Sequence, residues 1–153
     1  SGNAHLNPGD ATHSIGDTNC LIMTAHRKAL SRALGQKVEV QGHTDLTLGG
    51  VKFSGNAQRR RRSALLFHGT FLLGLDLSRL GQALRFPSSV PAYRDGRSHE
   101  AFCRNLPLAD GPLKAALGQV WQTDGQAEAP DTNAIGDLAR RKYGNPEWIH
   151  RRP

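Results

Sequence analysis

Two short alternating runs on either side of a glycine pair constrain the fold of this chain more than any other feature. Residues 45–48 (Asp-Leu-Thr-Leu) and 51–55 (Val-Lys-Phe-Ser-Gly) are separated by Gly49-Gly50. Glycine adopts positive φ angles at little cost, so a glycine pair between two such runs predicts a β-hairpin. Side chains alternate between the two faces of a strand, and this alternation places Lys52 and Ser54 on the same face.

Helix-type and strand-type segments alternate through most of the 153 residues. Apolar residues at three- and four-residue spacing predict a long helix over residues 18–35, capped by Asp17 or Thr18 and followed by Gly35. We also expect strand-type runs at 37–41 and 64–75, the second with its apolar residues interrupted at 68–70, and a basic loop at 59–62. Shorter helices are expected at 77–84, 98–105, 110–121 and 132–143, with Ser98 as a cap of the second and Asp131 or Thr132 as a cap of the last. Because hairpins make neighbouring strands antiparallel, we predict an α/β (α+β) fold with a mixed, largely antiparallel sheet flanked by helices.

The net charge and the cysteine content limit which binding partners and which cellular compartment we expect. The net charge is +7, which favours anionic partners, although such a charge also serves solubility. Only 6% of the residues are aromatic, fewer than stacking on single-stranded nucleic acid requires, so nucleic acid is not the expected partner. No apolar run approaches the ~20 residues of a membrane helix. With no secretory leader and only two cysteines, Cys20 and Cys103, we expect a cytoplasmic protein without a disulfide framework.

The hairpin opens a longer pattern. Residues 45–58 read Asp-Leu-Thr-Leu-Gly-Gly-Val-Lys-Phe-Ser-Gly-Asn-Ala-Gln, four arginines follow, and a strand-type run contains His68-Gly69-Thr70. This order resembles the signature of the lipoate–protein ligase family, in which a hairpin with Asp-Leu, a glycine turn and Lys-x-Ser-Gly-[Ser/Asn]-Ala precedes an arginine-containing loop and a His-Gly-Thr strand. The resemblance implies the biotin/lipoate ligase architecture, akin to class II synthetases. It covers residues 1–107 as the motif-bearing core and leaves 108–153 as the helical end of a single, partial catalytic domain spanning 1–153.

The resemblance also implies a reaction. The family activates lipoate or octanoate with ATP and Mg²⁺ to an acyl-AMP and transfers the acyl group to a lysine of an acidic lipoyl carrier domain. Negative charge develops on the carboxylate, the α-phosphate and the tetrahedral oxyanion, so one fixed cation serves both half-reactions. The resemblance assigns this catalytic role to Lys52 and gives Asp45 a role in holding the nucleotide or Mg²⁺. It further implies that substrate or nucleotide is bound by Ser54, Gly55, Asn56, Ala57, Gln58, His68, Gly69 and Thr70.

The beginning of the chain fits the family less closely. Ser1-Gly2-Asn3-Ala4 and the later Pro8-Gly9-Asp10 resemble a glycine-rich loop that offers backbone N–H groups to phosphate or carboxylate, which makes Ser1, Gly2 and Asn3 candidate binding residues. The family's arginine pair and preceding strands are missing, and Asn3 stands where glycine is usual. Missing strands would leave an exposed sheet edge, so we expect a homodimer or pairing with a missing N-terminal partner. A non-catalytic half-domain or accessory subunit stays an alternative.

A second alternative is an octanoyltransferase, which takes the acyl group from a carrier thioester onto a cysteine. One branch of the family places this cysteine just before the hairpin, where this chain has Gly42-His43-Thr44-Asp45. We expect Cys20 and Cys103 to be buried small apolar residues and therefore favour the ATP-dependent ligase. Residues 91–102 resemble a bacterial branch of the family, but the sequence assigns them no chemistry.

The residues taken singly allow plainer interpretations. Lys52 could be a solvent-facing strand lysine, Asp45 a turn-forming carboxylate, and His68 a core residue with a satisfied hydrogen bond. The arginines at 59–62 form either a solvated loop or a contact with the carrier domain or the ATP phosphates. These alternatives differ in where the side chains lie.

Overall fold

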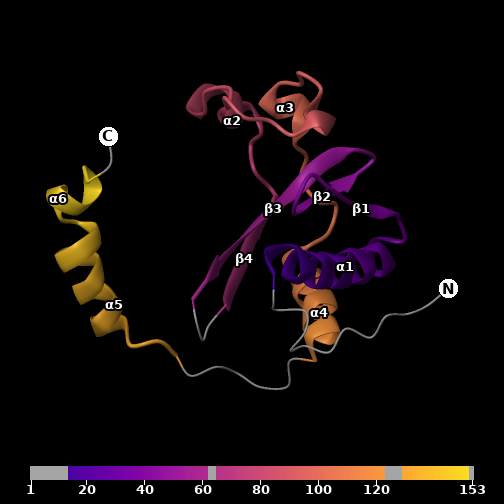
Figure 1. Cartoon of the computed structure of the whole chain (residues 1–153). Coiled ribbons are helices and arrows are strands. Elements are labelled where there is room, and N and C mark those ends of the chain that lie inside the picture. Colours follow the sequence, from indigo (N-terminus) through magenta and orange to yellow (C-terminus); the bar gives the residue numbers. More distant parts are fainter. Residues whose placement is uncertain (1–13, 62–64, 123–128, 152–153) are drawn as a thin grey trace. The chain divides into compact units, whose positions relative to one another are not determined.

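The computed structural model describes residues 14–61, 65–122 and 129–151. The chain divides into two compact units, residues 1–122 and residues 123–153, and each unit is described by itself (Figure 1). Within the described residues, no helix is long and apolar enough to cross a membrane. The prediction of one partial catalytic domain over residues 1–153 stays a prediction.

A four-stranded antiparallel sheet organises the first unit. Its strands, in the order β1-β2-β3-β4, are Val38–Gln41, Asp45–Leu48, Val51–Arg60 and Leu65–Phe71. Each strand pairs with the next one in the sequence, so the sheet is a meander (Figure 1). The predicted α+β class with antiparallel neighbours is therefore confirmed.

The predicted hairpin joins β2 to β3. Both turn glycines take left-handed backbone angles, with φ of 57° at Gly49 and 75° at Gly50, as the glycine pair predicts. Leu46 pairs with Ser54 but Thr47 pairs with Lys52, which leaves Phe53 as an extra residue in β3. This bulge breaks the simple alternation expected from the sequence, because Phe53 and Ser54 are both buried.

The core lies where helices α1 (Ile15–Leu34) and α4 (Asp110–Trp121) pack with the hairpin end of the sheet (Figure 1). Phe53 has no exposed surface, because the bulge turns its ring into this core. The buried apolar cluster consists of Met23, Leu30, Val38, Leu46, Leu48, Phe53, Leu106 and Leu113. The core therefore supports the same hairpin that carries Lys52.

Two local predictions were wrong for identifiable reasons. Helix α1 begins at Ile15 and is capped by Ser14, whose side chain accepts from the Asp17 N–H, so neither Asp17 nor Thr18 is the cap. The predicted loop at 59–62 is wrong for its first half, because Arg59 and Arg60 pair with Leu66 and Leu65 and so extend β3. The polar residues 68–70 interrupt the apolar run but not the strand, as the predicted His-Gly-Thr strand requires, since they pair with residues 55–57 and β4 continues through them.

The connection after β4 contains short helices: α2 (Ser78–Ala83), the 3₁₀ turn η2 (Ala92–Arg94) and α3 (His99–Phe102). Ser98 caps α3 by accepting from the Ala101 N–H, as predicted. The hydrogen bond from the Arg104 N–H to the Lys52 carbonyl oxygen, at 2.8 Å, returns the chain to the side of β3. Residues that follow β4, although distant in sequence from the hairpin, therefore lie next to it.

The second unit consists of α5 (Thr132–Leu138), the π-helical turn η3 (Ala139–Tyr143) and α6 (Pro146–Ile149). Asp131 caps α5 by accepting from the N–H groups of Asn133 and Ala134, as the sequence predicts.

Strand β4 is one edge of the sheet, and its Leu66 side chain is 58% exposed. The predicted homodimer, or pairing with an N-terminal partner, stays a prediction.

Candidate active site

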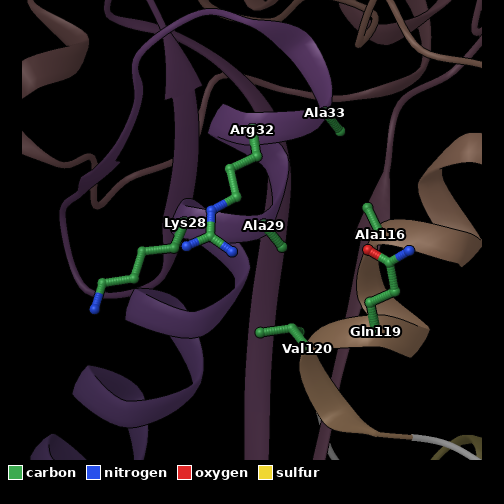
Figure 2. Close-up of a pocket in the computed structure, with 7 residues that line it drawn as sticks. All are labelled: Lys28, Ala29, Arg32, Ala33, Ala116, Gln119 and Val120. Carbon is green, nitrogen blue, oxygen red and sulfur yellow. The ribbon is translucent and has the colours of Figure 1, made fainter.

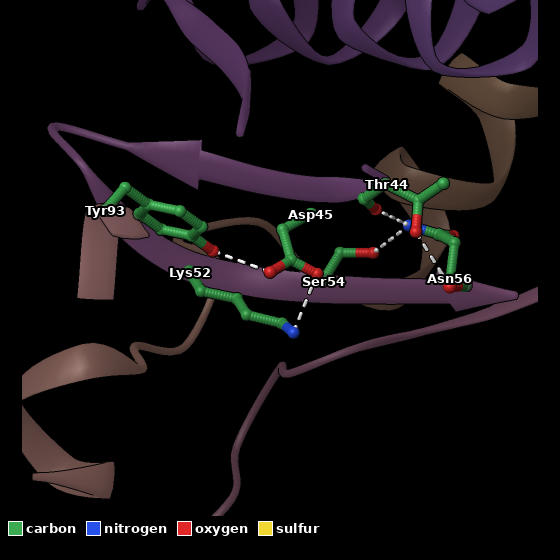
Figure 3. Close-up of polar contacts among 6 residues, drawn as sticks. All are labelled: Thr44, Asp45, Lys52, Ser54, Asn56 and Tyr93. Carbon is green, nitrogen blue, oxygen red and sulfur yellow. Dashed lines mark hydrogen bonds and ion pairs between the residues drawn. The ribbon is translucent and has the colours of Figure 1, made fainter. Parts of the chain in front are cut away.

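The hairpin places Lys52 and Asp45 in contact. The Lys52 Nζ lies 2.7 Å from Asp45 Oδ1, and the two side chains are 27% and 16% exposed (Figure 3). Lys52 is therefore not the solvent-facing lysine that the sequence also allowed. A half-sheltered ammonium beside a carboxylate is held in one position while it keeps N–H donors for a further oxygen.

Tyr93 completes this ion pair from the connection after β4. Its hydroxyl donates to Asp45 Oδ2 at 2.6 Å (Figure 3). Burial of the phenol, together with the hydrogen bond to Asp45 and the charge of that carboxylate, raises the pKa of Tyr93 well above its usual range. Tyr93 therefore stays a protonated donor at neutral pH. The role of Tyr93 could not be predicted, because nothing in the sequence of residues 91–102 indicates which strand they contact.

Asn56 ties β3 to the turn before β2. Its Nδ2 donates to the Thr44 carbonyl oxygen at 2.7 Å and to Ser54 Oγ at 3.3 Å, and Thr44 Oγ1 donates to the Asn56 carbonyl oxygen at 2.8 Å (Figure 3). Ser54 is 1% exposed. The structure therefore brings Ser54 and Asn56 next to the Asp45 strand, where their polar groups bind one another.

Two glycines make room for these side chains. A Cβ atom at Gly55 would lie 3.2 Å from both Cε and Nζ of Lys52, so the absence of a side chain there lets Lys52 lie along the strand. A Cβ atom at Gly69 would collide with the Asn56 amide oxygen, 1.9 Å away. In the structure the two glycines make room for Lys52 and Asn56, and the expectation that they also let a ligand approach stays a prediction.

The remaining predicted residues lie farther along β3 and β4. Gln58 Nε2 donates to the Ile15 carbonyl oxygen at 3.0 Å and to Asn19 Oδ1 at 2.6 Å, which fastens β3 to the start of α1. Ala57 pairs with His68, and His68 and Thr70 are exposed on β4. His68 is therefore not the core histidine that the sequence allowed. The predicted residues Ser1, Gly2 and Asn3 lie outside the described residues, and binding roles for all these positions stay predictions.

Asp45 is the residue to which the sequence analysis assigned Mg²⁺. Both of its carboxylate oxygens already accept, one from Lys52 and the other from Tyr93. Among the residues that the structure describes, no group of three or more His, Cys, Asp or Glu side chains is arranged to hold a metal ion. The described residues thus hold no metal site built from protein side chains alone, the role of Asp45 toward Mg²⁺ stays a prediction, and no step below is assigned to the ion.

Cys103 lies beside Lys52, and the prediction that Cys20 and Cys103 are both buried is wrong. Cys103 and Lys52 form an isolated parallel bridge, and Cys103 is only partly buried while Cys20 is exposed. Burial raises the pKa of the Cys103 thiol, and the positive charges of Lys52 and Arg94 oppose that rise. The sequence did not indicate that Cys103 lies near Lys52, because this proximity depends on the path of the connection after β4.

The described part of the first unit has several hollows, and two of them are of similar size. One, of about 510 Å³, borders the ion pair and is lined by residues 42–45 and 89–92, including Asp45. The other, of about 480 Å³, separates α1 from α4 and has Lys28 and Arg32 along one side (Figure 2). Only the first is lined by a predicted site residue, so it is the candidate substrate cavity.

The comparison with known families shows to which family the chain belongs. The model of the lipoyl protein ligase A/B catalytic domain matches residues 12–107. The chain belongs to this family. Among curated proteins, the chain is similar to the octanoyltransferase LipM of Kyrpidia tusciae, with 37% identity over 120 residues, which cover 71% of this chain and 44% of that protein. Lipoate–protein ligase 1 of Staphylococcus aureus is 35% identical over 132 residues, which cover 79% of this chain and 40% of that protein.

Solved structures agree with the family fold. Lipoate–protein ligase A bound with ATP superposes with a TM-score of 0.64 at 20% identity, covering 84% of this chain and 58% of that one. A bi-partite lipoate protein ligase of Thermoplasma acidophilum gives a TM-score of 0.63 at 20% identity, covering 84% and 56%. The chain thus has the fold of the family and spans less than half the length of these curated relatives.

Proposed function

We propose that the chain transfers a lipoyl or octanoyl group to a lysine of an acidic carrier domain after ATP-dependent activation of the free acid. The observation that carries the proposal is the Lys52 ammonium, held 2.7 Å from Asp45 Oδ1 and 27% exposed. Membership of the lipoyl protein ligase A/B family supports this chemistry, and the net charge of +7 favours approach of an acidic carrier.

Lys52 would act on oxygen atoms in both half-reactions. In the first, the acid's carboxylate attacks the α-phosphorus of ATP and pyrophosphate leaves. In the second, the amine of the carrier lysine attacks the acyl carbonyl carbon and loses a proton. The bond between that carbon and the phosphate oxygen breaks, and AMP leaves. A positioned ammonium stabilises the negative charge that grows on the phosphate and carbonyl oxygens, and Asp45 keeps that ammonium in place.

Incubation of the chain with lipoate, ATP, Mg²⁺ and an unmodified carrier domain tests the proposal. We expect pyrophosphate release and a carrier whose mass rises by one lipoyl group. Lys52→Ala should abolish both signals, whereas Lys37→Ala should retain them, because Lys37 is 79% exposed and pairs only with Glu39 in the described structure. A chain without activity, or a Lys52→Ala variant as active as the original, would refute the proposal.

A specific observation favours a second candidate, transfer from an octanoyl thioester. Cys103 lies beside Lys52, and the curated relatives include octanoyltransferases. In this reaction the Cys103 sulfur attacks the thioester carbonyl, the carrier thiol leaves with the cysteine proton, and the acyl group then passes from Cys103 to the lysine amine, which restores the thiol. The Cys103→Ser variant separates the routes. It should lose thioester-dependent transfer without ATP, and it should retain ATP-dependent ligation.

A further inference from the structure

We propose that Tyr93 is a positioning residue for acyl transfer: its hydroxyl orients the Asp45 carboxylate so that the opposite oxygen holds the Lys52 ammonium. This inference rests on the proposed function for its catalytic consequence. It also gives a role to residues 91–102, for which the sequence alone indicated none.

The contacts form a chain of three groups. Tyr93 Oη donates to Asp45 Oδ2 at 2.6 Å, and Lys52 Nζ lies 2.7 Å from Asp45 Oδ1 (Figure 3). The terminal torsion of an aspartate is broad, so one contact leaves the carboxylate free to turn, whereas contacts on both oxygens fix its plane. Lysine is a point charge on a flexible four-carbon stem. The position of the Lys52 ammonium therefore depends on how well its partner is held.

The ring of Tyr93 is held from two sides. Its centroid lies 5.1 Å from that of Phe102 at an interplanar angle of 41°, and Phe102 is 4% exposed. On the other side, a Cβ atom at Gly42 would lie 3.6 Å from Tyr93 Cε1, which places the ring against the turn between β1 and β2. The hydroxyl thus projects from a fixed ring.

Arg97 fastens the backbone of Tyr93 to the hairpin that carries Lys52. Its Nη2 donates to the Tyr93 carbonyl oxygen at 2.6 Å, and its Nη1 donates to the Gly50 carbonyl oxygen at 3.1 Å. The guanidinium is planar with its donors in a fixed fork, so it sets the distance between the two backbones. One side chain therefore couples the Tyr93 segment to the turn next to Lys52.

Arg94 holds the segment around Tyr93 in place from its buried side. It is 4% exposed, and its guanidinium carbon lies 4.5 Å from the ring centroid of Phe86 and 4.8 Å from that of Phe102. Its Nε donates to the Arg97 carbonyl oxygen at 2.9 Å, and Arg97 Nε donates to the Arg94 carbonyl oxygen at 3.0 Å. A site residue supported by such a packed, hydrogen-bonded shell is held to a narrow geometry.

The Tyr93→Phe variant tests positioning, because it removes the hydroxyl and keeps the ring that packs on Phe102. We expect kcat for carrier acylation to fall about 10- to 100-fold, with KM for lipoate and ATP changed less than about twofold, since the loss concerns geometry in the transition state. The matched control is Tyr143→Phe, which alters the other tyrosine of the chain, 48% exposed, and should leave both constants unchanged. An unchanged kcat, or a change confined to KM, would overturn the inference.

A double-mutant cycle on stability reads the contact independently of activity. Urea denaturation gives the free energy of unfolding of the original chain, Tyr93→Phe, Asp45→Ala and the double variant. Because the Tyr93 hydroxyl donates to Asp45 Oδ2 at 2.6 Å, we expect the two substitutions to be coupled, so that the double variant loses less stability than the sum of the two single losses.

The two measurements distinguish failure of this inference from failure of the proposed function. If the stability effects of the two substitutions are additive, Tyr93 does not hold Asp45 and the inference is overturned whatever the activity. If they are coupled but the chain transfers no acyl group, the proposed function is overturned and the catalytic role of Tyr93 falls with it, although the contact stands.

Discussion

Asp45 and Lys52 face each other across the β2–β3 hairpin, with 2.7 Å between the carboxylate Oδ1 and the ammonium Nζ. The glycine turn closes the hairpin, the bulge at Phe53 anchors it in the core, and Gly55 leaves room for the lysine stem. These three features together hold the Lys52 ammonium in one position.

Asp45→Asn should reduce acyl transfer much more than it reduces stability. The amide keeps the shape of the side chain but no longer attracts the Lys52 ammonium, so we expect activity about 10- to 100-fold lower and a free energy of unfolding lower by about 1–2 kcal/mol. Activity assays and urea denaturation measure the two effects. Asp110→Asn is the matched control, because Asp110 forms an exposed pair with Lys114 on α4. Equal losses of activity in both variants would contradict the account.

Gly69→Ala should destabilise the sheet. The new methyl group would meet the Asn56 amide oxygen at 1.9 Å, so Asn56 must move and give up its bond to the Thr44 carbonyl oxygen. Loss of this partly buried hydrogen bond predicts a decrease of about 1–3 kcal/mol in the free energy of unfolding. Gly74→Ala serves as the comparison, since nothing lies within 4 Å of its Cβ position. Equal stability of the two variants would show that Asn56 is not held against Gly69.

Cys103 should react more slowly than Cys20 with iodoacetamide near neutral pH. The thiolate is the reactive form, and burial raises the pKa of Cys103, so less of it is ionised there. Cys20 is exposed and accessible to the reagent. Peptide mass spectrometry after timed alkylation measures both rates, and the Cys103 rate should still be increasing with pH above the ordinary thiol value of 9.0. Faster labelling of Cys103 than of Cys20 at neutral pH would contradict this placement.

Stability should fall as the pH drops below 6.5. Burial lowers the pKa of His26 from 6.5, and the ring accepts from Trp121 Nε1 at 2.9 Å. The unfolded chain therefore binds a proton more readily than the folded one, and protonation favours unfolding from pH 6.5 down to the lowered pKa. Urea denaturation across this range should show the slope, and His26→Gln should reduce it. If His26→Gln leaves the slope unchanged, a group other than His26 causes the pH dependence of stability.

Local sequence signals predicted the elements that depend on nearby residues. The hairpin follows from Gly49-Gly50, and the caps of α3 and α5 follow from Ser98 and Asp131, because each contact spans only a few positions. The true end of β3 was missed, since Arg59 and Arg60 are strand residues only by pairing with β4. Propensity alone does not indicate that partner.

The site could be predicted only as far as the hairpin extends. Lys52 and Asp45 lie on its two strands, so their meeting follows from the local fold. Tyr93 and Cys103 reach the same place through the connection after β4, whose course is set by the contacts of Phe102 and Arg97 rather than by periodicity. Glycine spacing likewise does not indicate whether a gap admits a ligand or a neighbouring side chain.

Affinity for a non-hydrolysable analogue of lipoyl-AMP tests the central claim most directly. Isothermal titration should show binding by the original chain and by Lys37→Ala, and binding about 10- to 100-fold weaker by Lys52→Ala, because a charge-assisted hydrogen bond to the phosphate or carbonyl oxygen is lost. Equal affinity of Lys52→Ala and the original chain would contradict the role of the Lys52 ammonium.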